Sequence, residues 1–243
     1  MARRRPATTH GVAVVDKPAG VTSHDVVGML RRRFGERQVG HAGTLDPDAT
    51  GVLVVAVGKA TRLLRFVEKT RKGYTGEVVL GTSTSTLDAA GDVVGSFDMS
   101  AVTLDDARAA VAEHLVGDIE QVPPMVSAIR VDGKRLHELA REGIEVERSA
   151  RPVTIHRFDV VEWAAPGVLA IDVECSAGTY IRTLADDLGR LLGGGAHLRR
   201  LRRTHVGEFT IREAAPPDEC ELLPVESAVR SLDAVTVDDD VAA

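Results

Sequence analysis

Along this chain, runs of consecutive apolar residues alternate with segments in which apolar residues recur at helical spacing. Residues 52–57 are apolar at every position, which is typical of a strand buried on both faces. Shorter apolar runs predict further strands at residues 11–15, 74–80, 153–161 and 168–175. Apolar stripes at helical spacing predict helices at residues 22–34, 103–115 and 180–192. Strands and helices of this kind around one core predict a mixed α+β fold.

Polar residues and glycines mark the ends of the expected helices. Thr22 or Ser23 is placed to cap the first helix, and Thr103 with Asp106 forms a capping box before the second. Three glycines at residues 193–195 end the third helix. These signals agree with the helix limits that the hydrophobic spacing predicts.

The stretch from residue 122 to residue 152 differs in character from the rest. It opens with two prolines, carries many charges, and contains one short amphipathic helix expected around residues 134–142. We interpret it as an insertion in a main domain that covers residues 1–212. Residues 213–243 hold nine acids and one base, and we expect a separate acidic C-terminal segment there.

Composition restricts the class of protein. With 243 residues, 44% of them hydrophobic and 27% charged, the chain can bury a substantial core, which excludes a disordered or disulfide-stapled protein. Cys175 and Cys220 lack the spacing of a zinc or redox pair and are expected to be buried thiols. No apolar run approaches the length of a membrane span, and no secretory signal is recognisable. We expect a soluble, cytoplasmic monomer.

Charge is unevenly distributed along the chain. The net charge of −6 argues against a polyanionic partner, yet residues 1–75 hold 14 Lys and Arg against 6 Asp and Glu, a net of +8. Residues 190–212 add a net of +5, while residues 76–120 and 213–243 each carry −8. Because local patches and not totals steer association, this distribution favours RNA or DNA as a partner.

The most informative loop is GHAGTLDPDATG at residues 40–51, directly before the expected buried strand. Its glycines permit tight turns, and Pro47 favours an extended backbone at Asp46, which fixes the direction of that carboxylate. A loop anchored on a rigid strand is suited to catalysis. Two alternatives are a simple turn role for Asp46 and Asp48, and a metal cluster of both with His41, for which no further ligands stand at suitable spacing.

A second cluster, CSAGTYIR at residues 175–182, ends an expected strand and opens a helix. Arg182 stands where the helix dipole disfavours a cation, so it requires a carboxylate or phosphate partner. Tyr74 and Tyr180 each lie beside a basic or glycine-rich turn, and either is otherwise an ordinary core aromatic. An arginine run suits an RNA backbone as well as a solvated face; it comprises Arg199, Arg200, Arg202 and Arg203.

These motifs resemble those of the TruB family of bacterial tRNA pseudouridine synthases. Residues 40–51 with KATR at 59–62 resemble the family's catalytic motif, and DKPAGVTS at 16–23 its N-terminal motif. QVPPMVSAI at 121–129 and REG at 141–143 resemble its inserted thumb. GTYIRTL at 178–184 and LRR at 201–203 resemble its closing motifs. The resemblance runs in order from about residue 11 to residue 212.

The resemblance implies a fold, an activity and a partner. The implied fold is the pseudouridine synthase fold, a mixed, mostly antiparallel central sheet flanked by helices, with the thumb inserted at about residues 122–152. The family isomerises one uridine of the TΨC loop of tRNA, position 55, without cofactor or metal. The base is flipped, detached at N1, rotated and rejoined through C5. The implied partner is the TΨC stem-loop, with no membrane involved.

The resemblance also implies a role for individual residues. Asp46 is the implied essential carboxylate, which attacks the base, attacks C1′ or deprotonates C2′. Arg182 matches the arginine that pairs with this aspartate, and Tyr74 matches the residue that stacks on the flipped uracil. The other matched residues are His41, Tyr180 and Leu201, which bind substrate, and Lys17 and Pro18, which support the site.

Two other function classes remain open from the residues alone. A non-catalytic RNA-binding module predicts that Asp46→Asn changes nothing measurable. A metal-dependent phosphodiesterase built on His41, Asp46 and Asp48 predicts strand cleavage that a chelator stops. Family members usually continue into a small C-terminal RNA-binding domain, of which we expect at most the beginning here, ahead of the acidic residues 238–240.

Overall fold

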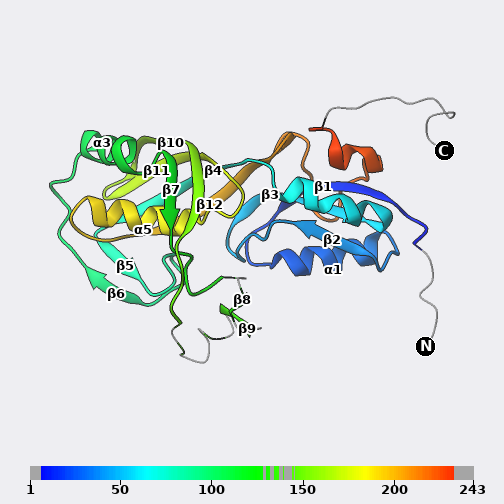
Figure 1. Ribbon diagram of the computed structural model, residues 1–243, viewed down its shortest axis with the longest axis horizontal. Coiled ribbons are helices and arrows are strands. Elements are labelled where there is room, and N and C mark those ends of the chain that lie inside the picture. Colours follow the sequence, from blue (N-terminus) through cyan, green and yellow to red (C-terminus); the bar gives the residue numbers. More distant parts are fainter. Residues whose placement is uncertain are drawn as a thin grey trace. The chain divides into compact units, whose positions relative to one another are not determined.

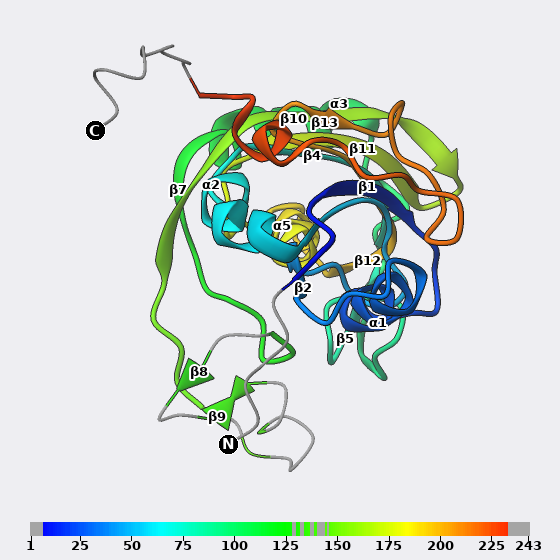
Figure 2. The same ribbon diagram turned by 90° about the vertical axis from the view of Figure 1, so that its right-hand side faces the viewer.

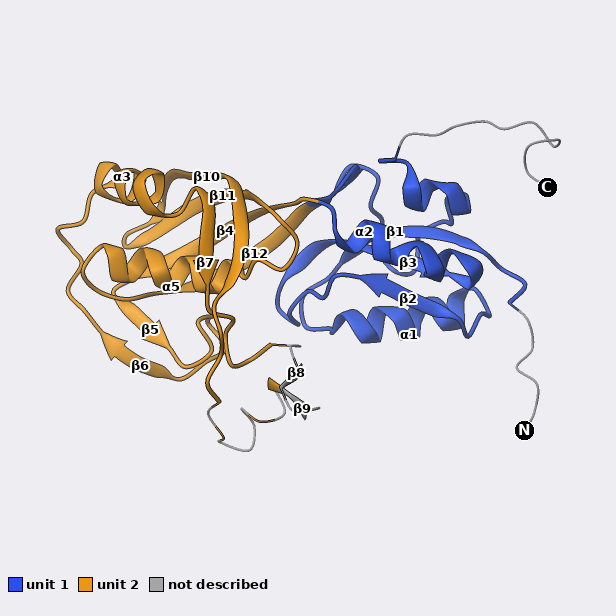
Figure 3. Cartoon of the chain, viewed as in Figure 1, with its two compact units in different colours: residues 1–70, 205–243 blue, residues 71–204 orange. Residues whose placement is uncertain are grey.

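The computed structural model describes residues 7–127, 130–131, 134–136, 139, 144 and 146–232 (Figure 1). The chain divides into two compact units (Figure 3), and each is described by itself. Unit 1 comprises residues 1–70 and 205–243, and unit 2 comprises residues 71–204. No helix in the part of the chain described here is long and apolar enough to cross a membrane.

Unit 1 is built around three antiparallel strands. Strands β1 (Gly11–Lys17) and β2 (Val39–Ala42) both pair with β3 (Thr50–Val57). Helix α1 (Ser23–Arg33) packs on one face of this sheet. The other face is covered by η1 (Gly58–Leu63), α2 (Leu64–Glu68) and η2 (Val225–Val229), so that α1 and α2 lie on opposite faces (Figure 2).

The two-residue period of β1 explains why both faces are covered. Ala13 and Val15 pack toward α1, whereas Val12 and Val14 pack toward α2. A strand that is apolar on both faces must be covered on both, which accounts for the unbroken hydrophobic run in β3.

The first part of the acidic C-terminal segment packs against β1. Leu223 exchanges two backbone hydrogen bonds with Val12, at 3.0 and 2.8 Å. The N–H of Asp16 donates to the carbonyl of Ala215 at 2.8 Å, and the N–H of Ala215 donates to Val14 at 3.1 Å. This segment follows strand β13 (Phe209–Thr210) and belongs to unit 1. Residues 238–240 lie outside the described residues.

Unit 2 contains a larger, mostly antiparallel sheet. Its strand order is β12 (Ala196–Val206), β4 (Lys72–Leu80), β11 (Val168–Cys175), β10 (Arg151–Ala165) and β7 (Gly117–Gln121). Helix α3 (Leu104–His114) is tied to β10 because the Nε of Arg108 donates to the carbonyl of Val160 at 3.0 Å. Helix α5 (Ile181–Leu191) buries its apolar side chains. Two short hairpins are β5 (Thr82–Thr84) with β6 (Val93–Ser96), and β8 (Arg130–Val131) with β9 (Lys134–Arg135).

The structure confirms the α+β class, the five predicted strands, and the helices predicted at residues 22–34, 103–115 and 180–192, with small shifts at their ends. Thr22 caps α1 in a capping box with Asp25, and Thr103 caps α3 in the same way with Asp106. Cys175 and Cys220 are buried free thiols, and burial raises the pKa of Cys175 to about 11.

Two stretches differ from the sequence expectation. Residues 39–42, expected as part of a glycine-rich loop, form β2, because their backbone pairs with β3. Residues 196–206, expected only as a basic element, form β12. The short helix expected around residues 134–142 falls largely outside the described residues; of those described, Lys134–Arg135 form β9, and Leu136 and Leu139 are helical.

Candidate active site

The residues singled out by the sequence fall into two groups. Unit 1 holds Lys17, Pro18, His41 and Asp46. Unit 2 holds Tyr74, Tyr180, Arg182 and Leu201.

The loop that carries Asp46 connects the paired strands β2 and β3. Leu45 and Ala49 are buried on either side of the half-exposed Asp46, and the N–H of Ala49 donates to the carbonyl of Asp46 at 3.1 Å. Two buried side chains and a backbone turn therefore hold this aspartate where it remains accessible to solvent.

A buried lysine supports the loop directly after Asp46. Lys17 has 0% exposure, and its ammonium donates to the carbonyls of Pro47 at 2.8 Å, Val21 at 2.7 Å and Pro18 at 2.9 Å. An ammonium has three N–H donors, and three carbonyls receive them here. The N–H of Gly20 also donates to Pro47, at 3.0 Å. Lys17 thus stabilises the backbone next to Asp46.

A buried serine supports the loop directly before Asp46. The Ser23 hydroxyl accepts from the N–H of Leu45 at 2.9 Å and donates to its carbonyl at 3.1 Å. Ser23 is the first residue of α1, so the helix and the loop are joined through one side chain. Asp46 therefore has its backbone held from both neighbours, Leu45 and Pro47.

The other two residues of this group are less enclosed. Pro18 is exposed, and its carbonyl is one of the three acceptors of Lys17. His41 is half-buried on β2 opposite Val55. Among the residues that the structure describes, no three His, Cys, Asp or Glu side chains are grouped to hold a metal ion. The described residues therefore offer no support for a metal cluster of His41, Asp46 and Asp48.

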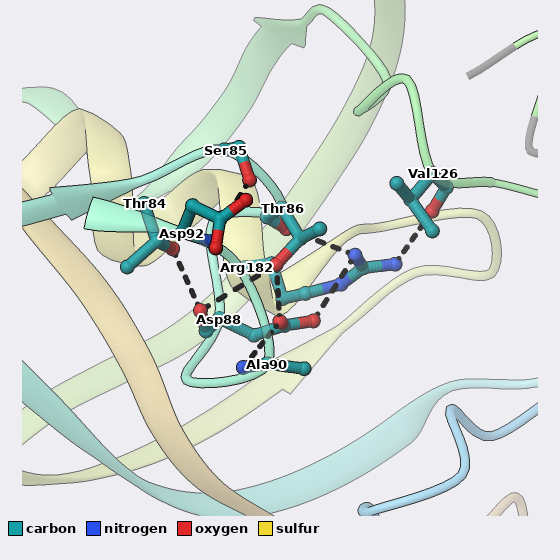
Figure 4. A network of polar contacts seen from close by, with 8 residues as sticks. All are labelled: Thr84, Ser85, Thr86, Asp88, Ala90, Asp92, Val126 and Arg182. Atoms are coloured by element: carbon teal, nitrogen blue, oxygen red, sulfur yellow. Dashed lines mark hydrogen bonds and ion pairs between the residues drawn. The ribbon is translucent and has the colours of Figure 1, made fainter. Parts of the chain in front are cut away.

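Arg182 has a carboxylate partner in unit 2, as its position at the helix start required. Its side chain is 5% exposed, and its Nη1 lies 3.2 Å from Oδ2 of Asp88 (Figure 4). The same nitrogen donates to the carbonyl of Thr86 at 3.0 Å, and Nη2 donates to the carbonyl of Val126 at 2.8 Å. A guanidinium is planar and its N–H donors point in fixed directions, so these three contacts fix the orientation of the Arg182 side chain.

Asp88 is itself fixed by the turn between β5 and β6. Its Oδ1 accepts from the Thr86 hydroxyl at 2.5 Å and from the N–H of Ala90 at 3.1 Å, while its carbonyl accepts from Thr84 at 2.6 Å (Figure 4). Leu87, which precedes it, has φ +62°, a conformation that non-glycine residues rarely adopt. Strained residues of this kind concentrate at functional sites, so the whole turn belongs with Arg182 as a candidate site element.

Tyr74 is buried on β4, opposite Val173 of β11. Its hydroxyl hydrogen-bonds to the guanidinium of Arg203, which is 1% exposed. Burial lowers the pKa of Arg203, and the interaction with Tyr74, whose oxygen accepts from the guanidinium, acts in the opposite direction. Both alternatives that the sequence left open for Arg203, an RNA backbone contact and a solvated face, are wrong, because this side chain is inside the unit.

The rest of the arginine run lies along β12. Arg199 and Arg200 both pair with Glu77 of β4, Arg199 through Nε at 2.7 Å and Arg200 at 3.6 Å. Arg200 keeps 76% of its side chain exposed. Leu201 is half-buried between them and the interior-facing Arg203. The run is therefore part of one strand, with Arg199 and Arg200 exposed and Arg203 in the interior.

Sequence reasoning missed the residues that hold the candidates in place. Asp88 lies in a segment with no motif, and its only signal is a run of Thr, Ser and Asp typical of a turn. Ser23 was expected as a helix cap and as the last residue of the N-terminal motif, but not as a support of the Asp46 loop. Gln121, which contacts the backbone of Tyr180, stands at the start of a recognised motif. Its residue type and its spacing from other polar residues do not indicate this contact.

Comparison with protein families gives two adjoining matches. Residues 31–181 match the TruB family pseudouridylate synthase (N terminal domain), and residues 182–222 match the tRNA pseudouridylate synthase B C-terminal domain. The chain is 54% identical to tRNA pseudouridine synthase B of Arthrobacter sp. (strain FB24), over 91% of this chain and 75% of that protein. It is also 54% identical to tRNA pseudouridine synthase B of Mycobacterium avium (strain 104), over 88% and 70%.

Solved structures show the same fold at lower identity. A Cbf5–Nop10–Gar1 complex aligns with a TM-score of 0.69 and 29% identity, over 90% of this chain and 61% of that one. An H/ACA RNP bound to a substrate RNA containing 2′-deoxyuridine aligns with a TM-score of 0.65 and 28% identity, over 90% and 60%. This chain thus spans about three fifths of those solved chains.

Proposed function

Because the chain belongs to the TruB family of pseudouridylate synthases, we propose that it converts the uridine at position 55 of the tRNA TΨC loop into pseudouridine, with Asp46 as the essential carboxylate. The family match supports isomerisation of uridine in tRNA. The position in the loop and the role of Asp46 are finer than that match, and they are implied by the resemblance of residues 40–51 to the family's catalytic motif.

The proposed reaction is an isomerisation in which no atom is gained or lost. The N1–C1′ bond breaks, the uracil rotates, and a C5–C1′ bond forms. The proton on C5 then leaves to solvent, and N1 takes up a proton in its place. A carboxylate is suited to this sequence as a nucleophile at the base or at C1′, or as a base at C2′. All three routes require that Asp46 be ionised and held in a fixed direction.

The observation that supports Asp46 most is the way its backbone is held. Ser23 bonds both backbone groups of Leu45, and Lys17 bonds the carbonyl of Pro47. A catalytic group must keep its geometry within a fraction of an ångström, and buried hydrogen bonds on both neighbours provide this. Asp48, two residues later, is exposed in the same loop, whereas Asp46 is half-exposed.

The unit 2 residues are proposed to bind the substrate. A flipped base requires a flat aromatic partner and apolar lining, which Tyr74, Tyr180 and Leu201 supply by type. Arg182 is already fixed by Asp88 and two carbonyls, so it is pre-organised to meet a negatively charged group. We assign His41 to contact with the tRNA, and Pro18 to support of the loop with Lys17.

Release of the C5 proton tests the proposed function. Incubation of the protein with unmodified tRNA that carries tritium at C5 of its uridines is expected to transfer the label of one uridine to water. Asp46→Asn is expected to reduce the release rate by about a thousandfold or more, because the carboxylate acts in the chemical step. tRNA binding by this variant is expected to stay within about threefold of wild type, since a single carboxylate is not needed for affinity.

The matched control is Asp48→Asn, which makes the same change two residues away at an exposed side chain. We expect its release rate to stay within about twofold of wild type. Full retention of tritium by the wild-type protein contradicts the proposed activity, whereas equal rates for Asp46→Asn and wild type remove Asp46 from the mechanism. RNA binding without tritium release would instead favour a binding module.

We further propose that the protein acts as a monomer in the cytoplasm, where unmodified tRNA is found. Size-exclusion chromatography with light scattering tests the first point, and a dimeric mass contradicts it.

A further inference from the structure

Helix α5 begins in a way that differs from α1 and α3. The first N–H groups of any helix lack partners within the helix and need an external acceptor. In α1 and α3 a local capping box supplies it, from Thr22 with Asp25 and from Thr103 with Asp106. The cap residue of α5 is Tyr180, and its side chain makes no capping hydrogen bond.

The backbone of this cap residue is instead bonded to Gln121, 59 residues earlier in the chain. The N–H of Tyr180 donates to Oε1 of Gln121 at 2.8 Å, and Nε2 of Gln121 donates to the carbonyl of Tyr180 at 3.1 Å. Gln121 is 2% exposed and is the last residue of β7. Its amide thus performs for α5 what the acidic residue of the capping box performs for the other two helices.

The two hydrogen bonds fix the part of α5 that carries the proposed substrate-binding residues. Both backbone groups of Tyr180 are held, which sets the direction in which its ring leaves the chain. Arg182 follows two residues later and is tied by Nη2 to the carbonyl of Val126, five residues beyond Gln121. The start of α5 is therefore bonded to the end of β7 and to the segment after it.

We propose that Gln121 is a positioning residue, which sets Tyr180 and Arg182 for the reaction by holding the backbone of Tyr180. This inference rests on the proposed function, because it assigns Gln121 to the geometry of the same site. Gln121 itself does not touch the reacting atoms. A local cap at this helix start would require Ser, Thr, Asp or Asn at position 180, where the proposed site needs an aromatic ring.

Two substitutions of equal length test the role. Gln121→Met removes both hydrogen bonds, and Gln121→Glu keeps the acceptor but loses the donor when ionised, so that its carboxylate faces the carbonyl of Tyr180. The rate constant is measured in single turnover, with saturating enzyme and tRNA tritiated at C5, so that it reports folded molecules. We expect about a tenfold or larger fall for Gln121→Met, because small displacements of binding groups are costly.

The pH dependence of Gln121→Glu provides a readout that a purely structural role does not change. A protonated glutamate again donates to the carbonyl of Tyr180, so its rate relative to wild type is expected to rise as the pH falls from about 8.5 to about 5.5. The Michaelis constant for tRNA is expected to stay within about threefold of wild type, because phosphate contacts dominate tRNA affinity. Hydrogen exchange at the Tyr180 amide is expected to be faster in Gln121→Met than in wild type.

The matched control is Arg108→Met, which also removes two hydrogen bonds from a side chain to backbone, those to Val160 and Val161. Its rate constant is expected to stay within about twofold of wild type. Unchanged rate constants in both Gln121 variants, an equal loss in Arg108→Met, or variants that are simply unfolded at the assay temperature each overturn the positioning role. Wild-type protein without tritium release contradicts the proposed function instead, while amide exchange at Tyr180 still tests the contact of Gln121.

Discussion

One hydroxyl, that of Ser23, holds both backbone groups of Leu45, the residue before Asp46, at 2.9 and 3.1 Å. Leu45 is buried, so water cannot replace either hydrogen bond. The first turn of α1 and the Asp46 loop are thereby joined across 22 residues of sequence. Loss of the Ser23 hydroxyl is therefore expected to change the geometry of Asp46 as well as the stability of α1.

Ser23→Ala is expected to lower the free energy of unfolding by about 1–3 kcal/mol, because two buried backbone groups lose their partner. Turnover is expected to fall about tenfold, since the backbone next to Asp46 gains freedom. Urea unfolding and tritium release measure the two effects. Thr22→Ala is the control: it removes the cap of the same helix at a cost of about 1 kcal/mol and leaves turnover unchanged. Equal losses of turnover in both variants would show that only helix stability matters.

Lys17→Met is expected to destabilise the protein by at least about 3 kcal/mol, because three carbonyls lose a charged donor inside the unit. The apolar chain of methionine fills much of the space but donates no hydrogen bond. Equilibrium unfolding in urea measures the change. Lys59→Met, at an exposed lysine of the same unit, is expected to stay within about 0.5 kcal/mol of wild type. A loss below about 1 kcal/mol for Lys17→Met would contradict the support proposed for the loop.

Asp88→Asn removes the carboxylate that faces Arg182 at 3.2 Å. Since the Arg182 side chain is only 5% exposed, we expect a loss of about 1–3 kcal/mol in unfolding free energy and a clear fall in turnover. Thermal unfolding and tritium release are the measurements. Asp92→Asn, in the same turn at an exposed side chain, serves as the control and is expected to change neither. Wild-type turnover in Asp88→Asn would separate this turn from the site.

The stability of the folded protein is expected to depend on pH through Asp187. Burial, followed by the neighbouring charge of Asp186, raises the pKa of Asp187 from 3.8 to about 6. Between these pH values the folded protein holds the proton more tightly than the unfolded chain, so this group makes stability fall as the pH rises from about 4 to about 6.

Asp187→Asn removes that penalty. Because the carboxyl is only half-buried and partly screened by solvent, we expect a gain of about 1 kcal/mol at pH 7.5 and none at pH 4. Urea unfolding at the two pH values measures it. Glu113→Gln, at an exposed carboxyl, is expected to show no difference between them. An equal effect of Asp187→Asn at both pH values would contradict the raised pKa.

Local sequence determined much of the fold. The apolar run at residues 52–57 specified β3, because a strand covered on both faces has no polar position. Thr103 and Asp106 specified the start of α3, since a capping box is made by residues three apart. The Asp46 loop was recognisable for a similar reason, because its glycines and Pro47 act on neighbouring residues.

Only the tertiary structure decided what holds the candidate site in place. The contacts of Lys17 with Pro47, Gln121 with Tyr180, and Arg182 with Thr86 span 30, 59 and 96 residues of sequence. Arg203 shows the same limit, since its charge predicted a surface position and its place on β12 buries it against Tyr74. Hydrophobic periodicity and helix capping depend on residues that are close in the sequence, so they can be predicted from a short segment. A hydrogen bond between distant residues exists only once the strands and helices that carry them have packed.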